Sequence, residues 1–255
     1  MSAILAVARG TFREAVRDRV LFLVVGFGVA ALVMSRVLAP IALGEGDRVT
    51  IDLGLSTLGL LGIVIVALVG TGLVHKELER RTIHVVLSRP VSRASYLVGK
   101  WLGLSGTMAV AVAAMGVILL AVAVWMRGPQ AVGPVTQAVF LLALSNMVLA
   151  ALAVLFSSLS TPVLSVVYTL GLYATGFWTN DMRDFAAVMP GALGSLVRGV
   201  SFVMPNLELF NLRPQVAHME SAPTIQLVLA LGYALAYAAA VLALAVVAFE
   251  RRELK

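Results

Sequence analysis

The chain has 255 residues, of which 60% are hydrophobic and 13% are charged, and its mean hydropathy is +0.99. A water-soluble domain of this length could not bury so much apolar surface, so the composition predicts an integral membrane protein. The net charge of +6 comes from basic residues in short segments between apolar runs, which argues against nucleic-acid binding. Without cysteine, disulfides and thiolate metal sites are excluded.

The first segment, residues 1–19, is predicted to form an amphipathic helix at the membrane surface. Arg9, Arg13 and Arg17 lie four residues apart on one face, and apolar residues recur at helical spacing on another. A solvated helical lead-in to the first span fits the same pattern. No small-residue cleavage site follows the next apolar run, so we do not expect a cleavable signal sequence.

Six apolar stretches are candidate membrane spans, because about 20 helical residues cross a ~30 Å hydrocarbon core. They are residues 20–43, 53–74, 101–126, 135–156, 163–178 and 223–249. A polar loop is predicted at residues 44–52 and a polar turn at residues 127–134. The uncharged interval after this turn is too long for one span, so a break is predicted between Ser157 and Pro162.

Small residues are frequent in and near the second and third spans. The second span contains Gly54, Gly59, Gly62, Gly70 and Gly72, and a G-x-x-x-G pattern, Gly99 and Gly103, precedes and opens the third. In lipid, small residues allow helices to approach closely, although membrane helices are in general rich in glycine.

Residues 179–222 are predicted to lie outside the spans, on the extracytoplasmic side. Apolar residues from Met189 to Met204 follow the helical repeat, which favours an amphipathic helix at the outer interface over a loop with an apolar stretch. Most lysines and arginines lie on the side that holds both termini and residues 75–100. By the positive-inside rule this side is cytoplasmic, in a cell (inner) membrane.

The charged block at residues 75–100 is predicted to form a helical elbow on the cytoplasmic face. Residues 76–88 have an apolar and a polar helical face, Pro90 forces a break after Arg89, and Ser92 can cap a helix that leads into the third span. Such an elbow is either a basic membrane anchor or a helix that docks in the groove of a soluble partner.

Two runs of residues resemble a known family. The run ERRTIHVVLSRPVSR, from Glu79 to Arg93, followed by Tyr96 and Gly99–Lys100, is similar to the signature of ABC type-2 exporter permeases. The run PNLELFNL, from Pro205 to Leu212, also resembles these permeases, and with the hydropathy pattern the likeness covers nearly the whole chain. Arg81 stands where the common pattern has glycine.

The resemblance implies an all-α transmembrane permease domain over residues 1–255. Such a permease pairs with a second copy or a paralogue among membrane lipids and docks ATP-binding cassette ATPase subunits, which bind ATP and Mg. No cofactor is expected on this chain, and it has no G-x-x-x-x-G-K-[ST] phosphate loop, so it is not expected to be an enzyme. The residues implied in ATPase coupling are Glu77, Glu79, Arg81, Arg89, Pro90 and Arg93.

Other classes of protein leave different signatures. A secondary transporter needs ionisable residues at mid-membrane, and the predicted spans have almost none. An intramembrane enzyme needs a catalytic cluster, yet His75, His84 and His218 are scattered. A scaffold for a surface, motility or enzyme-maturation complex stays open, as does the substrate. Candidate substrate-path residues, for which interhelical hydrogen bonding is the favoured alternative, are Ser145, Asn146, Tyr168, Tyr173 and Thr175.

Overall fold

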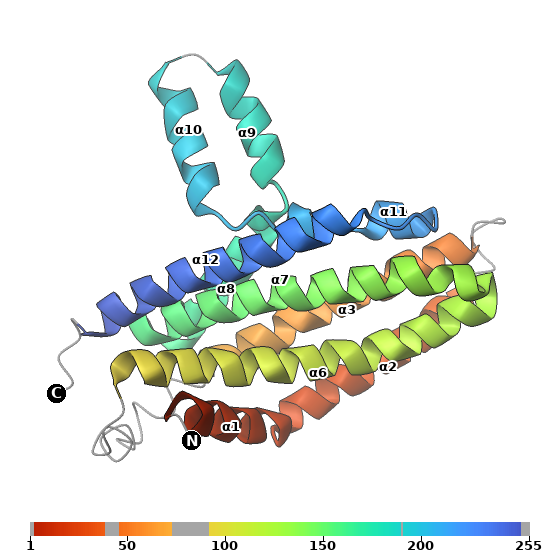
Figure 1. Cartoon of the computed structure of the whole chain (residues 1–255), viewed down its shortest axis with the longest axis horizontal. Helices are drawn as coiled ribbons and strands as arrows, with labels where there is room; N and C mark the ends of the chain where they lie inside the picture. Colours follow the sequence, from red (N-terminus) through yellow and green to blue (C-terminus); the bar gives the residue numbers. More distant parts are fainter. Residues whose placement is uncertain (1–2, 39–45, 73–91, 190, 251–255) are drawn as a thin grey trace.

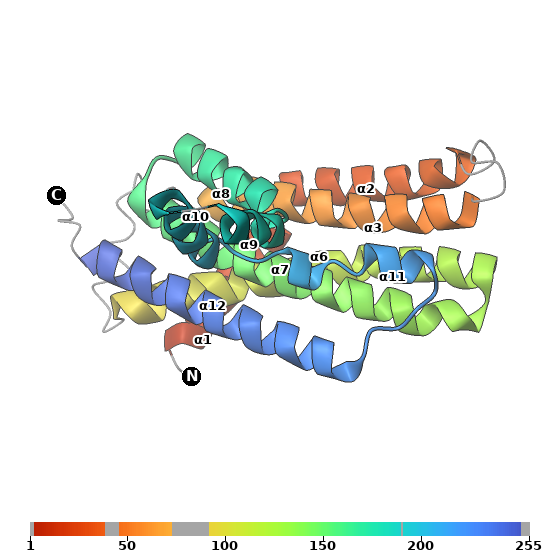
Figure 2. The same ribbon diagram turned by 90° about the horizontal axis from the view of Figure 1, so that it is seen from above.

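The computed structural model describes residues 3–38, 46–72, 92–189 and 191–250, and all the regular structure in these ranges is helical. The long helices run roughly along one axis (Figure 1). Seen from above, α2 and α3 lie side by side as one layer, α6 and α7 form the middle of the bundle, and α12 lies on the far side of α7 (Figure 2). The all-helical class predicted from the sequence is therefore confirmed for the described residues.

The chain begins with two helices, α1 (Ala3–Val16) and α2 (Arg19–Leu38), which meet at a bend of 59°. The bend lies at Asp18, whose Oδ1 accepts a hydrogen bond from the Val20 backbone N–H at 2.9 Å. A side-chain acceptor here satisfies a donor that the start of α2 would otherwise leave unpaired. α1 thus forms a separate helix, and its position at the membrane surface remains a prediction.

The predicted polar loop at residues 44–52 is wrong from residue 46 onward, because α3 (Gly46–Ile65) already begins there. Asp47 lies in the first turn, where a negative charge is favourable near the helix N-terminus, and its carboxylate lies 3.1 Å from Nε of Arg127 on α6. Because its charge is paired, Asp47 can form part of a helix that extends beyond the apolar layer. α3 continues into a π-helical turn, η2 (Val66–Gly70).

The central helices follow the predicted spans closely. α6 (Arg93–Arg127) contains the third predicted span and ends at Gly128, whose φ of 79° suits glycine. A short 3₁₀ turn, η3 (Pro129–Ala131), leads into α7 (Val132–Leu159). The predicted break after the fourth span is confirmed, since α7 ends at Leu159 and α8 (Pro162–Gly176) begins at a proline.

In the described part of the chain, four helical segments are long and apolar enough to cross a membrane. A fifth is added if the bent pair α1 and α2 counts as one span. α8 has 15 residues, which is short of the length needed for a full crossing. The multi-pass character is thus supported, whereas the count of six spans remains a prediction.

Between α8 and the last helix the chain forms a projecting hairpin of α9 (Thr179–Val188) and α10 (Ala192–Val203) (Figure 1). The Arg183 guanidinium packs over the Phe202 ring at 5.1 Å and joins the two helices. The chain then returns to the bundle through η4 (Glu208–Phe210) and α11 (Arg213–Ala217) before α12 (Thr224–Glu250). The predicted outer segment therefore holds several helices, and its side of the membrane remains a prediction.

The link between α11 and α12 is fastened to α7 by one side chain. The Gln137 amide accepts a hydrogen bond from the Ala222 N–H at 2.8 Å and donates one to the Ala222 carbonyl at 3.3 Å. Both polar backbone groups of Ala222 are satisfied in this way. The start of α12 is consequently held at a fixed place on α7.

Close packing at small residues joins the main helices. α12 packs mainly on α7, and its buried face includes a row of alanines at Ala230, Ala234 and Ala238. α1 lies against the glycine pair of α6: a Cβ at Gly99 would lie 2.7 Å from the Val7 Cβ, and one at Gly103 would lie 2.6 Å from the Ala8 carbonyl oxygen. The G-x-x-x-G pattern is therefore a helix contact, and its partner is α1.

We expect Gly103→Ala to lower the stability of the protein, because the added methyl group would collide with the α1 backbone. Overpacking of this kind costs about 1–3 kcal/mol. The measurement is the melting temperature of the purified protein in detergent.

The matched control is Gly10→Ala on α1, where an added Cβ meets nothing within 4 Å. This variant should be neutral or slightly stabilising, because alanine favours a helix interior by about 0.5–1 kcal/mol relative to glycine. Equal melting temperatures for the two variants would contradict the close contact of α1 with α6.

Candidate functional site

The predicted ATPase-coupling elbow falls mostly outside the described residues. This applies to Glu77, Glu79, Arg81, Arg89 and Pro90. Arg93 is described, and it is the first residue of α6. Ser92 caps this helix as predicted: its Oγ accepts a hydrogen bond from the Ser95 N–H at 3.1 Å.

Arg93 joins the start of α6 to the end of α12. Its Nη1 donates hydrogen bonds to the carbonyl oxygens of Phe249 at 3.1 Å and Glu250 at 3.0 Å, and its guanidinium lies 5.9 Å from the centre of the Phe249 ring. The last carbonyls of a helix lack partners within the helix and attract positive charge. Arg93 therefore fixes the position of two helices at this end of the bundle.

Lys100 and Tyr96 extend the same cluster toward α1. Lys100 is only 2% exposed, and its Nζ lies 4.0 Å from a carboxylate oxygen of Glu14 and 5.7 Å from the centre of the Tyr96 ring. Tyr96 in turn stacks on Phe249 at 6.4 Å. We call Glu14, Arg93, Tyr96, Lys100 and Phe249 the terminal cluster, because they link α1, α6 and α12 at the end of the bundle where α6 begins and α12 ends (Figure 1).

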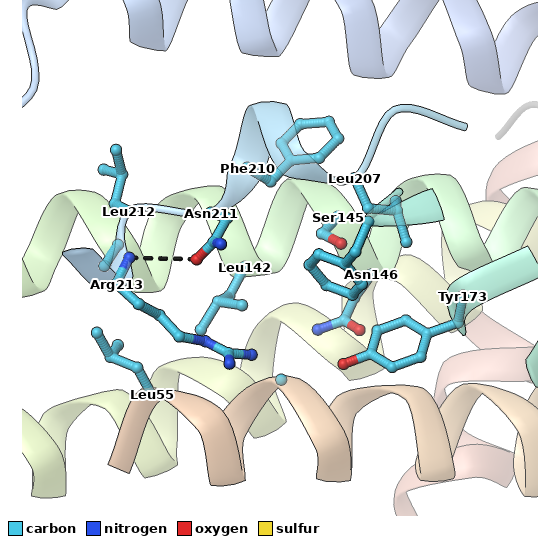
Figure 3. Close-up of a pocket in the computed structure, with 13 residues that line it drawn as sticks. Leu55, Leu142, Ser145, Asn146, Tyr173, Leu207, Phe210, Asn211, Leu212 and Arg213 are labelled. Atoms are coloured by element: carbon cyan, nitrogen blue, oxygen red, sulfur yellow. Dashed lines mark hydrogen bonds between the residues drawn. The ribbon is translucent and has the colours of Figure 1, made fainter. Parts of the chain in front are cut away.

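A polar cavity lies inside the bundle, between α3, α7, α8 and the segment around η4 and α11 (Figure 3). Three predicted substrate-path residues, Ser145, Asn146 and Tyr173, line it together with Asn211 and Arg213. It leaves about 20 Å³ for the centre of a water-sized sphere, enough for about one water molecule. Its remaining lining residues are glycine or apolar: Leu55, Gly59, Ala138, Leu142, Phe177, Leu207, Phe210 and Leu212.

The segment from Pro205 to Leu212 brings these groups into the bundle. Leu207, Phe210 and Leu212 are all buried. The Leu207 N–H donates to the Gly176 carbonyl at the end of α8 at 3.0 Å, and the Asn206 N–H donates to the Tyr233 hydroxyl on α12 at 2.8 Å. The run PNLELFNL thus closes one side of the cavity.

Arg213 lines the cavity but was not predicted as a site residue, because it lies in the segment that the sequence placed outside the spans. Its guanidinium reaches across the bundle to α3: a Cβ at Gly59 would lie 3.4 Å from Nη2 of Arg213 and 3.8 Å from the Tyr173 hydroxyl (Figure 3). The sequence feature that could have indicated it is the position of Arg213 directly after the largely apolar run PNLELFNL. The cavity is therefore lined by a positively charged side chain, that of Arg213.

Two predicted substrate-path residues lie away from the cavity. Tyr168 is 46% exposed, and its ring packs against Phe156 at 5.4 Å. Thr175 Oγ1 donates to the Gly171 carbonyl of its own helix at 2.9 Å. Tyr168 therefore packs against α7, and the Thr175 hydroxyl bonds within α8.

Comparison with known families identifies the chain. The family described as ABC-2 family transporter protein matches residues 5–254, nearly the full length. No curated protein matches it. The matched region includes the terminal cluster, the polar cavity and the segment that closes it. The chain belongs to the ABC-2 transporter family.

Proposed function

We propose that this chain is the transmembrane permease subunit of an ABC exporter in the cytoplasmic membrane. It pairs with a second permease copy, and it couples substrate movement to ATP hydrolysis by a separate ATP-binding cassette subunit that binds ATP and Mg. The family match over residues 5–254 carries this proposal. The chain itself would catalyse no reaction and carry no cofactor.

The terminal cluster supports a mechanical role for the end of α6. The residues implied in coupling directly precede Arg93, and Arg93 hydrogen-bonds to the end of α12. Lys100, one helical turn beyond Tyr96, faces Glu14 of α1. A force applied to the elbow by a closing ATPase dimer would therefore reach three helices together.

The partner is tested by purifying the full-length protein gently from its native membrane and identifying what comes with it. We expect an ATP-binding cassette subunit to co-purify. Its recovery should fall at least tenfold in the Glu79→Lys, Arg89→Glu double variant, because both charges of the docking elbow are reversed.

The control for this loss is Arg198→Gln, which removes an exposed charge on α10. A fully active preparation that transports substrate without any ATPase subunit would refute the proposal in favour of secondary transport.

The variant Arg93→Gln tests whether Arg93 positions the helices or contacts the ATPase subunit directly. Arg93→Gln removes charge-assisted hydrogen bonds to two carbonyl groups, each worth about 1.5–3 kcal/mol, so we expect a lower melting temperature. ATPase recovery should stay within twofold of wild type, whereas transport-coupled ATP hydrolysis should fall. The readouts are the melting temperature, the recovered ATPase and the hydrolysis rate.

The opposite pattern would contradict this role. An unchanged melting temperature with loss of the ATPase subunit would assign Arg93 to the partner interface and not to the geometry of the bundle.

A further inference from the structure

The cavity that contains Arg213 offers hydrogen-bond donors and a positive charge without a matching negative charge. In the described ranges, no carboxylate lies within 4.0 Å of the Arg213 guanidinium, as an ion pair would require. The Tyr173 hydroxyl of α8, an uncharged group, interacts with the Arg213 guanidinium, and both lie against Gly59 of α3. Arg213 is half-buried, and a charge withdrawn from water is costly unless a partner neutralises it.

The one acid in the adjoining segment is engaged elsewhere. Glu208 accepts hydrogen bonds from the Asn211 side-chain amide at 3.2 and 3.4 Å. The oxygen of that amide accepts from the Arg213 backbone N–H at 3.3 Å (Figure 3). These contacts fix the start of α11 and leave the guanidinium directed into the cavity.

A second, independent group in the cavity lacks an acceptor. Asn146 is 2% exposed, and its Nδ2 has no hydrogen-bond partner among the described residues. The amide packs closely against α3, where a Cβ at Gly62 would lie 2.5 Å from its nitrogen and 2.6 Å from its oxygen. Buried donors are nearly always paired in folded proteins, so an unpaired amide in the same cavity as a half-buried cation indicates an absent acceptor.

We infer that this cavity is a binding site for an anionic oxygen group, a phosphate or a carboxylate. One oxygen of the ligand would fill the water-sized space between the Arg213 guanidinium and the Asn146 amide. Arginine and amide donors suit such oxygens. Anion binding in this cavity would need this chain alone, without an ATPase subunit.

Two probes, applied to the full-length protein in phosphatidylcholine nanodiscs, distinguish a soluble anion from a lipid headgroup. One probe is inorganic phosphate added at constant ionic strength, and the other is replacement of part of the lipid by phosphatidylglycerol. A ligand that binds the folded state raises the melting temperature. A rise with both probes assigns a site open to soluble anions, and a rise with phosphatidylglycerol alone assigns a lipid headgroup or an acidic amphiphile.

The variant Arg213→Gln tests the residue that carries the site. We expect the rise in melting temperature to be lost in this variant, to be partly retained in Arg213→Lys, and to be unchanged in Arg198→Gln. An equal rise in wild type and Arg213→Gln, or no rise with either probe in wild type, would overturn the inference.

A further variant keeps the test informative if Arg213→Gln does not fold. Asn146→Asp would place a carboxylate in the cavity and supply the missing negative charge from within. We expect this protein to melt higher than wild type without ligand and to gain nothing from either probe. A lower melting temperature with the ligand effect intact would also overturn the inference.

Discussion

The structure depends on close approach of helix backbones at small residues. Within a membrane, water does not drive apolar helices together, so packing and interhelical hydrogen bonds must do so. Gly99 and Gly103 let α1 rest against α6, and the alanines of α12 let it pack along α7. A residue as small as alanine at Gly103 would displace α1 and, with it, the Glu14 side of the terminal cluster.

Charged groups inside the bundle follow two different patterns. At the terminal cluster, Lys100 faces Glu14 and Arg93 bonds to carbonyl oxygens, so positive charges meet negative or partly negative partners. In the polar cavity, Arg213 has only neutral neighbours among the described residues. The first arrangement stabilises the fold, whereas the second leaves the guanidinium without a negatively charged partner in the described residues. Because of this difference, we propose mechanical coupling at the terminal cluster and anion binding in the polar cavity.

The sequence predicted the features that rest on local rules. Apolar length located the long helices, Ser92 marked a helix start, and the serine and proline run after α7 marked a break. It failed where tertiary contacts decide. The charges of residues 46–52 suggested a loop, but Asp47 pairs with Arg127 far along the chain and the helix persists. Arg213 was assigned to a loop because hydropathy cannot show that an apolar segment folds back into the bundle.

The segment from Leu207 to Ala222, which connects the α9–α10 hairpin to α12, is hydrogen-bonded to two different helices, and this has a consequence for transport. Its first part is fastened to α8 at Gly176, and its last part is fastened to α7 by Gln137. Arg213 lies between these two attachments. Any sliding of α8 against α7 would stretch or slacken the intervening chain and shift the guanidinium. A change in helix position would thereby change the local electric field and the affinity of the cavity for the anion that we propose binds there.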